Sequence, residues 1–582
     1  MFAPFLNVSS SCTDRLWLAR PYEERSAQAF MQQQGLGDLA ARALSARGIG
    51  IAEAASFLDP KLRDALPDPS SFQDMDKAVA RFVAVLRAGE KIAVFGDYDV
   101  DGATSSALLL RFGRALGIPL RLYIPDRMRE GYGPNAPALQ SLAADGVKLA
   151  LCVDCGTTAH EPLKAAQEAG LDVIILDHHA AEPVLPSACA VINPNRLDES
   201  GQYSTLAAVG VTYLFVIAVN RALRAAGFYA AGRAEPDLVQ WLDLVALGTV
   251  CDVVKLTGLN RVFVAQGLKI AAQRRNVGLA ALGHVAGVRV WDAYAAGFLL
   301  GPRVNAGGRV GESDLGANLL STEDPARAST LAQHLHALNE ERRMIEAQVL
   351  REAETLAVAQ TLPMVFVAAE GWHPGVIGIV ASRLKEKFHR PALVIALEGE
   401  IGKGSGRSIG GIDLGAAVIA ARQAGLLING GGHKMAAGLT VARETISALQ
   451  DFLAERIGRQ MEEDPLRPTL MLDGLATGPG LTPAFVRQLA RLGPFGTGNT
   501  EPRLALADCK IIRADIVGEK HVRVIFTQSG TRLRGIAFRA MESDLGQALL
   551  AKPARIHLAG YARLDEWQGE ERVQLQISDA AV

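Results

Sequence analysis

The chain has 582 residues, of which 49% are hydrophobic and 21% are charged, and its formal net charge is −2. This length is too great for one hydrophobic core and predicts several domains, whereas the near-neutral charge excludes nucleic-acid binding through overall basicity. Six cysteines scattered over a long chain favour reduced thiols, and the N-terminus has no leader-like pattern, so we expect a cytoplasmic protein that does not enter a membrane.

Residues 1–75 are expected to form a separate segment of short helices and loops. Residues 76–320 then alternate between apolar strands and helices, with strands expected near residues 91–95, 120–124, 149–153 and 173–176. Such alternation is typical of a parallel sheet covered by helices. We therefore expect residues 76–320 to form an α/β lobe.

Three acids follow the first of these strands at alternate positions: Asp97, Asp99 and Asp101. Together with Gly102 they resemble the start of an EF-hand calcium loop, but that loop needs a glutamate at its twelfth position, which here is Leu108. A helix cap would account for one acid and not for three. Clustered carboxylates at the carboxyl end of a strand instead predict a site for a hard divalent cation.

Further candidate ligands follow apolar segments later in the lobe. They are Asp154, Asp177, His178, His179 and Asp252. If these segments are strands of one parallel sheet, their carboxyl ends share an edge and the side chains converge. Carboxylates mixed with imidazoles suit Mn²⁺ or Mg²⁺, and two such ions would activate a water for phosphoryl transfer. Taken singly, each acid would more often cap a helix or form a surface ion pair, but their joint placement favours a metal site.

The second half of the chain predicts three more units. A helix over residues 321–360 has apolar residues at helical spacing and is expected to join two lobes. A second α/β lobe is expected over residues 361–463, with glycine-rich stretches at 402–411 and 430–432. Residues 464–582 show short alternating strands with polar turns, which predict a small antiparallel β-barrel of the OB type.

These motifs resemble those of a known family. Residues 96–102, 153–156, 177–179 and 248–252 resemble the four motifs of the DHH phosphoesterase superfamily, and residues 404–408 and 430–433 resemble its substrate-binding DHHA1 domain. Residues 126–133, 301–309 and 492–499 narrow the resemblance to the RecJ family of single-stranded-DNA-specific exonucleases. The chain departs from the superfamily at Phe95, where many members have a metal-binding histidine.

The resemblance implies a role for each candidate residue. The implied ligands of two Mn²⁺ or Mg²⁺ ions are Asp99, Asp101, Asp154, His178 and Asp252. Asp154 would bridge the ions, and His179 would ligate or hydrogen-bond the scissile phosphate. Asp177 would orient the neighbouring histidine, and Asp97 would either support the ligands in the same way or shape the turn. The implied binding site for a 5′ phosphate consists of Arg127, Arg303, Ser405, Arg407 and His433.

The implied activity is that of a 5′→3′ exonuclease, which hydrolyses single-stranded DNA with two metal ions in DNA repair and recombination. Two alternatives remain open: a DHH enzyme that cleaves oligoribonucleotides or cyclic dinucleotides, and a catalytically inactive scaffold that binds DNA. The resemblance also implies a monomer, with single-stranded-DNA-binding protein and a RecQ-type helicase as partners.

Overall fold

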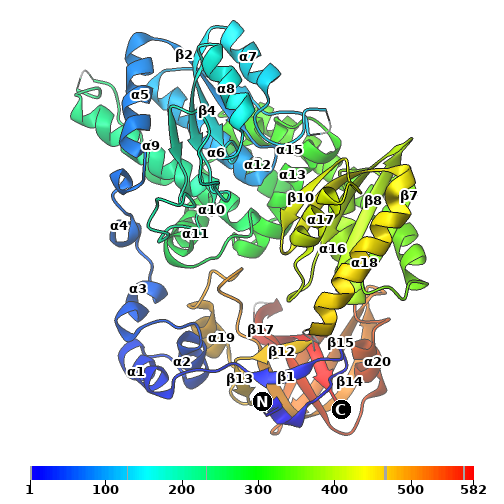
Figure 1. Cartoon of the computed structure of the whole chain (residues 1–582). Helices are drawn as coiled ribbons and strands as arrows, with labels where there is room; N and C mark the ends of the chain where they lie inside the picture. Colours follow the sequence, from blue (N-terminus) through cyan, green and yellow to red (C-terminus); the bar gives the residue numbers. More distant parts are fainter. Residues whose placement is uncertain (1–2, 128, 231, 464–467, 568–569) are drawn as a thin grey trace.

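The computed structural model describes residues 3–127, 129–230, 232–463, 468–567 and 570–582. Two α/β lobes are joined by a long helix, and a small β-barrel lies below both of them in the view of Figure 1. This arrangement confirms the predicted fold class. The predicted boundary at residue 464 lies outside the described residues.

The first lobe is built on a parallel sheet with the strand order β3-β2-β4-β5-β6. The strands are β2 (Lys91–Gly96), β3 (Leu120–Tyr123), β4 (Val147–Val153), β5 (Asp172–Leu176) and β6 (Ala190–Ile192). One face is covered by α5 (Met75–Ala88), α6 (Val100–Leu116) and α9 (Ala208–Ala225), and the other by α7 (Ala136–Ala144) and α8 (His160–Glu168). Because both faces are buried, the strands are continuous apolar runs rather than alternating ones.

The rest of the first lobe is helical. Its elements are α10 (Leu242–Cys251), α11 (Gly258–Ala271), α12 (Val277–Val285), η5 (Ala295–Leu300), α13 (Gly301–Val310) and α14 (Leu315–Ser321). Helix α9 is the one described helix whose length and composition would suit a membrane span, but 72% of it is buried inside the lobe. Burial of this kind is typical of a core helix.

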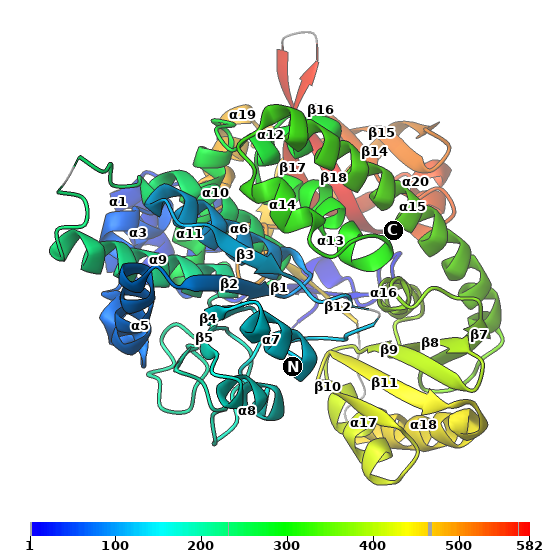
Figure 2. The same cartoon turned by 90° about the horizontal axis from the view of Figure 1, so that it is seen from above.

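The joining helix is α15 (Pro325–Val358), close to the predicted range. It begins at Asp324, whose side chain accepts a hydrogen bond of 2.9 Å from the amide of Ala326. Its first half packs on α12 and α13 and its second half on α16 and β7, and Figure 2 shows it running from one lobe to the other.

The second lobe has a mixed sheet with the order β10-β11-β9-β8-β7. Its strands are β7 (Val365–Glu370), β8 (Ala392–Glu398), β9 (Ile401–Arg407), β10 (Asn429–His433) and β11 (Ala436–Ala442), and its helices are α16 (Ile377–Phe388), α17 (Leu414–Gln423) and α18 (Ile446–Glu463). Residues 402–407 and 430–432 of the glycine-rich stretches lie in β9 and β10. A Cβ on Gly406 would lie 2.7 Å from the side chain of Leu414, so glycine permits close packing on that face of β9.

The barrel consists of β14 (Leu504–Val517), β15 (His521–Gln528), β16 (Thr531–Ala537), β17 (Ile556–Trp567) and β18 (Glu570–Ala581). Pairing of β14 with β17 closes it, which confirms the predicted barrel. The sequence predicted an all-antiparallel barrel, but β16 and β18 pair in parallel. Flanking elements are β12 (Thr469–Leu472), β13 (Gly474–Ala476), α19 (Pro483–Ala490) and α20 (Asp544–Ala551).

The N-terminal segment packs against the barrel, at the other end of the sequence, through residues up to Leu58, whereas residues 62–66 pack on the first lobe (Figure 1). It contains β1 (Leu16–Ala19), α1 (Glu24–Gln34), α2 (Asp38–Ser45), α3 (Ala54–Leu58) and α4 (Leu62–Ala65). Strand β1 was not predicted, and it pairs in parallel with β12. The buried indole nitrogen of Trp17 donates a hydrogen bond of 2.9 Å to Asp579, so the two ends of the chain stabilise each other.

Candidate functional site

The turn from β2 into α6 holds the first three acids of the site. Asp99 caps α6, because its Oδ1 accepts hydrogen bonds from the amides of Asp101, at 2.8 Å, and Gly102, at 3.1 Å. A Cβ on Gly102 would lie 2.3 Å from the carbonyl oxygen of Asp97, so the turn requires glycine there. Asp101 in turn accepts hydrogen bonds from the amides of Ala208 and Val209 at the start of α9.

Strands β4 and β5 supply the next ligands from their carboxyl ends. Asp154 follows β4 with a φ of 61°, in the left-handed region, where aspartate and asparagine are better tolerated than most residues. Asp177, His178 and His179 follow β5 directly. Because β4 and β5 are neighbours in the parallel sheet, these side chains converge as the sequence predicted.

Asp252 reaches the site from a helix. The sequence grouped it with the ligands at strand ends, but it is the C-cap residue of α10, so that prediction is wrong. The helix is buried all round, and a buried helix gives an apolar run without the usual amphipathic period. Its Oδ2 nevertheless lies 3.5 Å from Nε2 of His178.

His178 lies at the centre of the cluster. Its Nε2 is 3.3 Å from Oδ1 of Asp154 and 3.9 Å from Oδ2 of Asp101. Ligand atoms fall within 4.8 Å of one another in three overlapping groups, which are Asp97 with Asp99 and Asp154, Asp101 with His178 and Asp252, and Asp154 with His178 and His179. Asp154 therefore belongs both to an all-carboxylate group and to a group with imidazole.

The acids of the cluster are buried and face one another, and both effects disfavour their charged forms. Burial and the charges of Asp99 and Asp101 raise the pKa of Asp154 well above its usual value. Burial and the same two charges raise the pKa of Asp252 to about 9. Burial and the positive charge of His179 lower the pKa of His178 to about 4, so this ring is neutral and has a free lone pair.

Four buried ligand atoms have no hydrogen-bond partner among the described residues: Asp97 Oδ1, Asp154 Oδ1, His178 Nε2 and Asp252 Oδ2. A divalent cation would satisfy these atoms and offset the mutual repulsion of the carboxylates. Carboxylate oxygens with one or two imidazoles fit Mn²⁺ or Mg²⁺. The residues present therefore fit the metal that the sequence implied.

Asp97 lies closer to the metal cluster than the sequence predicted. The sequence assigned it to the layer behind the ligands, but its carboxylate is in one group with Asp99 and Asp154. Phe95 is fully buried, packs with residues of α7 and α8, and stacks on Tyr123 with ring centroids 5.2 Å apart. Phe95 therefore supplies no ligand atom, whereas Asp97 adds a carboxylate oxygen to the group that contains Asp99 and Asp154.

Asp177 fixes the second histidine rather than facing the cluster. Its Oδ1 lies 2.7 Å from Nδ1 of His179, and its Oδ2 accepts a hydrogen bond of 2.6 Å from the Thr157 hydroxyl. Burial disfavours a charged ring, but the hydrogen bond and charge of Asp177 outweigh it and raise the pKa of His179 to about 9. Tyr132 adds a hydroxyl 3.3 Å from the same ring. His179 is therefore held as a proton donor at the edge of the cluster.

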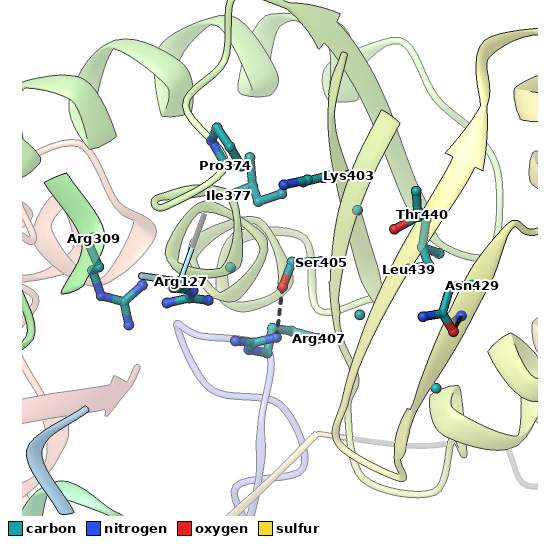
Figure 3. Close-up of a pocket in the computed structure, with 15 residues that line it drawn as sticks. Arg127, Arg309, Pro374, Ile377, Lys403, Ser405, Arg407, Asn429, Leu439 and Thr440 are labelled. Carbon is teal, nitrogen blue, oxygen red and sulfur yellow. Dashed lines mark hydrogen bonds between the residues drawn. The ribbon is translucent and has the colours of Figure 1, made fainter. Parts of the chain in front are cut away.

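A positively charged pocket of about 390 Å³ lies between the two lobes (Figure 3). Arg127 and Arg309 come from the first lobe and Lys403, Ser405 and Arg407 from β9, and none of the described lining residues is an acid. The N-terminus of α16 also faces the pocket, since a Cβ on its Gly378 would lie 3.0 Å from both Ser405 Oγ and Arg407 Nη2. Helix N-termini and guanidinium groups are preferred binding sites for phosphate.

Three of the five residues that the sequence assigned to this pocket line it: Arg127, Ser405 and Arg407. The lining does not include Arg303 or His433. Arg303 is buried and donates hydrogen bonds to the carbonyl of Leu299, at 2.6 Å, and to His336, at 3.2 Å. His433 ends β10 and its Nδ1 accepts a hydrogen bond from Met435.

Sequence reasoning missed Arg309 and Lys403. Arg309 lies six residues after Arg303 on α13, and the sequence alone does not say which of the two faces the pocket. Lys403 could have been found, because it alternates with Ser405 and Arg407 along β9 and therefore shares their face. Arg309 also donates a hydrogen bond of 2.9 Å to the carbonyl of Gly375, which connects the two lobes beside the pocket.

Aromatic residues of the barrel divide into core and surface. Phe526 is fully buried and belongs to the core, whereas Phe538 is half exposed. The guanidinium groups of Arg503 and Arg563 lie 5.0 and 5.9 Å from the ring centre of Tyr561. The side chain of Trp567 lies outside the described residues.

Comparison with known families matches three parts of the chain. Residues 91–249 match the DHH family, N-terminal domain, residues 359–459 match the DHHA1 domain, and residues 472–579 match the RecJ OB domain. Each match falls on one structural unit, which is the first lobe, the second lobe or the barrel.

The chain is also similar to whole proteins. It is 33% identical over 575 residues to the single-stranded-DNA-specific exonuclease RecJ of Bacillus subtilis (strain 168), covering 97% of this chain and 71% of the relative. It is 34% identical over 564 residues to the exonuclease of the same name from Escherichia coli (strain K12), covering 94% and 96%. The solved structure of RecJ in complex with Mn²⁺ from Thermus thermophilus matches with a TM-score of 0.82 at 31% identity, covering 97% of this chain and 78% of that one.

Proposed function

The chain belongs to the RecJ family of single-stranded-DNA-specific exonucleases, and we propose that it removes nucleotides from the 5′ end of single-stranded DNA by metal-dependent hydrolysis. One observation above all supports this function. A cluster of carboxylates and imidazoles with unpartnered buried atoms lies on the first lobe, and a pocket for a phosphate group lies between that lobe and the second.

Two of the three groups of candidate ligands would hold two Mn²⁺ or Mg²⁺ ions, and the third group links them through Asp154 and His178. Asp97, Asp99 and Asp154 form one group, and Asp101, His178 and Asp252, with Asp154 nearby, form the other. When bound, such ions lower the pKa of a water and stabilise the charge that develops on the phosphate. Asp177 orients His179, whose protonated ring would donate a hydrogen bond to an oxygen of the scissile phosphate.

The pocket between the lobes would bind the 5′-terminal phosphate. Ser405 Oγ and Arg407 Nη1 lie 3.1 Å apart and both face the N-terminus of α16. Arg127 connects the pocket to the first acidic motif, because its guanidinium lies 5.0 Å from the ring centre of Tyr98. Tyr98 stands between Asp97 and Asp99 in the sequence. A terminal phosphate held here would place the next phosphodiester near the metals, which accounts for cleavage from the 5′ end.

The comparisons favour this activity over the two alternatives. A RecJ OB domain match and similarity over nearly the whole chain to single-stranded-DNA-specific exonucleases do not fit an enzyme for cyclic dinucleotides. The full set of ligands argues against a catalytically inactive scaffold. The barrel would add a binding surface for the strand, with Tyr561 and its two arginines as candidates for contacts with bases and phosphates.

A nuclease assay tests the proposed function. We expect the protein to release labelled mononucleotide from 5′-labelled single-stranded DNA in Mn²⁺ and to release none in EDTA, because the cluster requires a cation. A blunt duplex of the same sequence should be cut far more slowly, since the 5′ end must enter a pocket between two lobes. Equal rates on duplex and single strand, or labelled fragments longer than a mononucleotide as first products, would contradict the proposal. Asp154→Asn protein purified in parallel controls for contaminating nuclease.

From the family resemblance we further propose a monomer that acts in the cytoplasm in DNA repair and recombination. Single-stranded-DNA-binding protein and a RecQ-type helicase are the proposed partners. Light scattering of the purified protein tests the monomer, and co-purification with each partner tests the assembly.

A further inference from the structure

Two aromatic rings that stack on each other lie exposed on the first lobe, at the start of the π-helix η5 and within it. Tyr294 is 62% exposed and Phe298 is 69% exposed. Their ring centroids are 5.2 Å apart and their planes differ by 26°. Single exposed apolar residues are ordinary, but this pair leaves two large flat faces in water beside each other. π-helical turns are rare and occur frequently at functional sites.

The pair lies next to the metal centre. Helix η5 packs on the last turn of α10, which Asp252 terminates. The carbonyl oxygen of Ala296 lies 3.4 Å from Sγ of Cys251, and a Cβ on Gly301 would lie 2.5 Å from the same sulfur. Val253, which follows Asp252 directly, is also exposed, at 66%. The two rings are thus carried by the element that supports a proposed metal ligand.

Beside the metal centre, the first lobe contacts the segment that leads into the barrel. Burial raises the pKa of Glu501, three residues before β14, and the negative charge of Asp292 also raises it. Glu501 pairs with Arg563, one of the two arginines beside Tyr561. The amide of Leu256, four residues after Asp252, donates a hydrogen bond of 2.7 Å to the carbonyl of Thr497. Tyr294 and Phe298 thus belong to a helix that packs against α10, and the loop after α10 contacts the segment that leads into the barrel.

We propose that Tyr294 and Phe298 form a stacking platform for unpaired nucleobases of the DNA strand, between the metal centre and the barrel. This inference rests on the proposed function. Every base has a flat π face, so a platform of this kind accepts any sequence. In a duplex the base faces are covered by their neighbours, so the platform adds a preference for single strands that the width of the pocket alone does not supply.

The test removes the rings but keeps an apolar side chain at each position. In the Tyr294→Leu/Phe298→Leu double variant, kcat/KM on a 5′-phosphorylated 20-mer should fall about 5- to 160-fold, the range expected for loss of stacking with one base. A matched strand that is abasic after its first nucleotide offers no ring to stack. On this strand the variant and the unaltered protein should have the same kcat/KM. The Tyr294→Phe variant keeps both rings and should behave like the unaltered protein on both strands.

Three results would overturn the platform: an unchanged kcat/KM of the double variant on the 20-mer, an equal loss on the abasic strand, or a loss with Tyr294→Phe. A binding readout is independent of catalysis. The fluorescence of 2-aminopurine in single-stranded DNA should be quenched by the unaltered protein in EDTA and not by the double variant. Equal quenching of the fluorescence by both proteins would contradict the proposal. If the unaltered protein hydrolyses neither strand, the proposed function fails, and the quenching result still decides on the platform.

Discussion

Replacing Asp154 with asparagine is expected to abolish hydrolysis of single-stranded DNA. Asp154 contributes to both the carboxylate group and the imidazole group of the cluster, so its loss weakens the binding of both ions. Metal ions supply several kcal/mol of stabilisation to a phosphoryl-transfer transition state, and each 1.36 kcal/mol is tenfold in rate, so kcat should fall by about 10³-fold or more. Release of mononucleotide in Mn²⁺ measures the effect, and near-normal turnover would show that the metal assignment is wrong.

Stability separates this role from a structural one. Asparagine tolerates the left-handed φ of 61° at this position, which alanine would not do as well. Asp154 has a folded pKa above its unfolded value, so its ionisation destabilises the folded state as the pH rises above about 4. In EDTA at pH 8 the asparagine variant should therefore unfold at the same or a higher temperature. Mn²⁺ should raise the Tm of the unaltered protein more than that of the variant.

Asp243 provides a matched control. It is buried in α10, and burial raises its pKa to about 7, but it is not part of the metal cluster. Its folded pKa is also above the unfolded value, so Asp243→Asn should stabilise the protein at pH 8 by the same logic. We expect this variant to keep its exonuclease activity. A loss of activity comparable to that of Asp154→Asn would mean that any buried charge in this lobe affects catalysis.

The sequence predicted the first lobe well because its strands are buried on both faces. Apolar runs such as residues 149–153 end abruptly at an acid, and the carboxyl edge of a parallel sheet then brings Asp154, Asp177 and His178 together. Asp252 was predicted from its place after an apolar run that was taken for a strand, but the run is a helix that ends at the same cluster. Position after an apolar run thus predicted which side chains converge in the cluster more reliably than it predicted the elements that carry them.

Contacts between distant segments could not be predicted in the same way. The pairing of β1 with β12 joins residues more than 400 positions apart, and four residues of strand give no periodicity to detect. The choice between Arg303 and Arg309 depends on the angle at which α13 packs, which no local pattern encodes. The position of Asp97 depends on the shape of one turn, which sets whether its carboxylate faces the cluster or the interior.

Replacing Arg407 is the second change with a large expected effect, and it should weaken recognition of the 5′ end. Its guanidinium is partly buried, and burial and the charge of Arg127 lower its pKa. Its hydrogen bonds are to Ser405 Oγ, at 3.1 Å, and to the carbonyl of Gly406, at 2.7 Å, and no ion pair with an acid is present among the described residues. A buried cation without an anion is costly unless a ligand supplies the anion. The 5′ phosphate of the strand is the anion that we propose.

For Arg407→Gln we therefore expect kcat/KM on 5′-phosphorylated single-stranded DNA to fall about 10- to 100-fold, because hydrogen bonds to charged groups contribute about 1.5–3 kcal/mol. On a strand with a 5′ hydroxyl the loss should be much smaller, so the ratio of the two kcat/KM values is the measurement. Arg303→Gln is the matched control, since Arg303 hydrogen-bonds to Leu299 and His336 instead of lining the pocket. If Arg303→Gln lowers that ratio and Arg407→Gln does not, the terminal phosphate binds elsewhere than in this pocket.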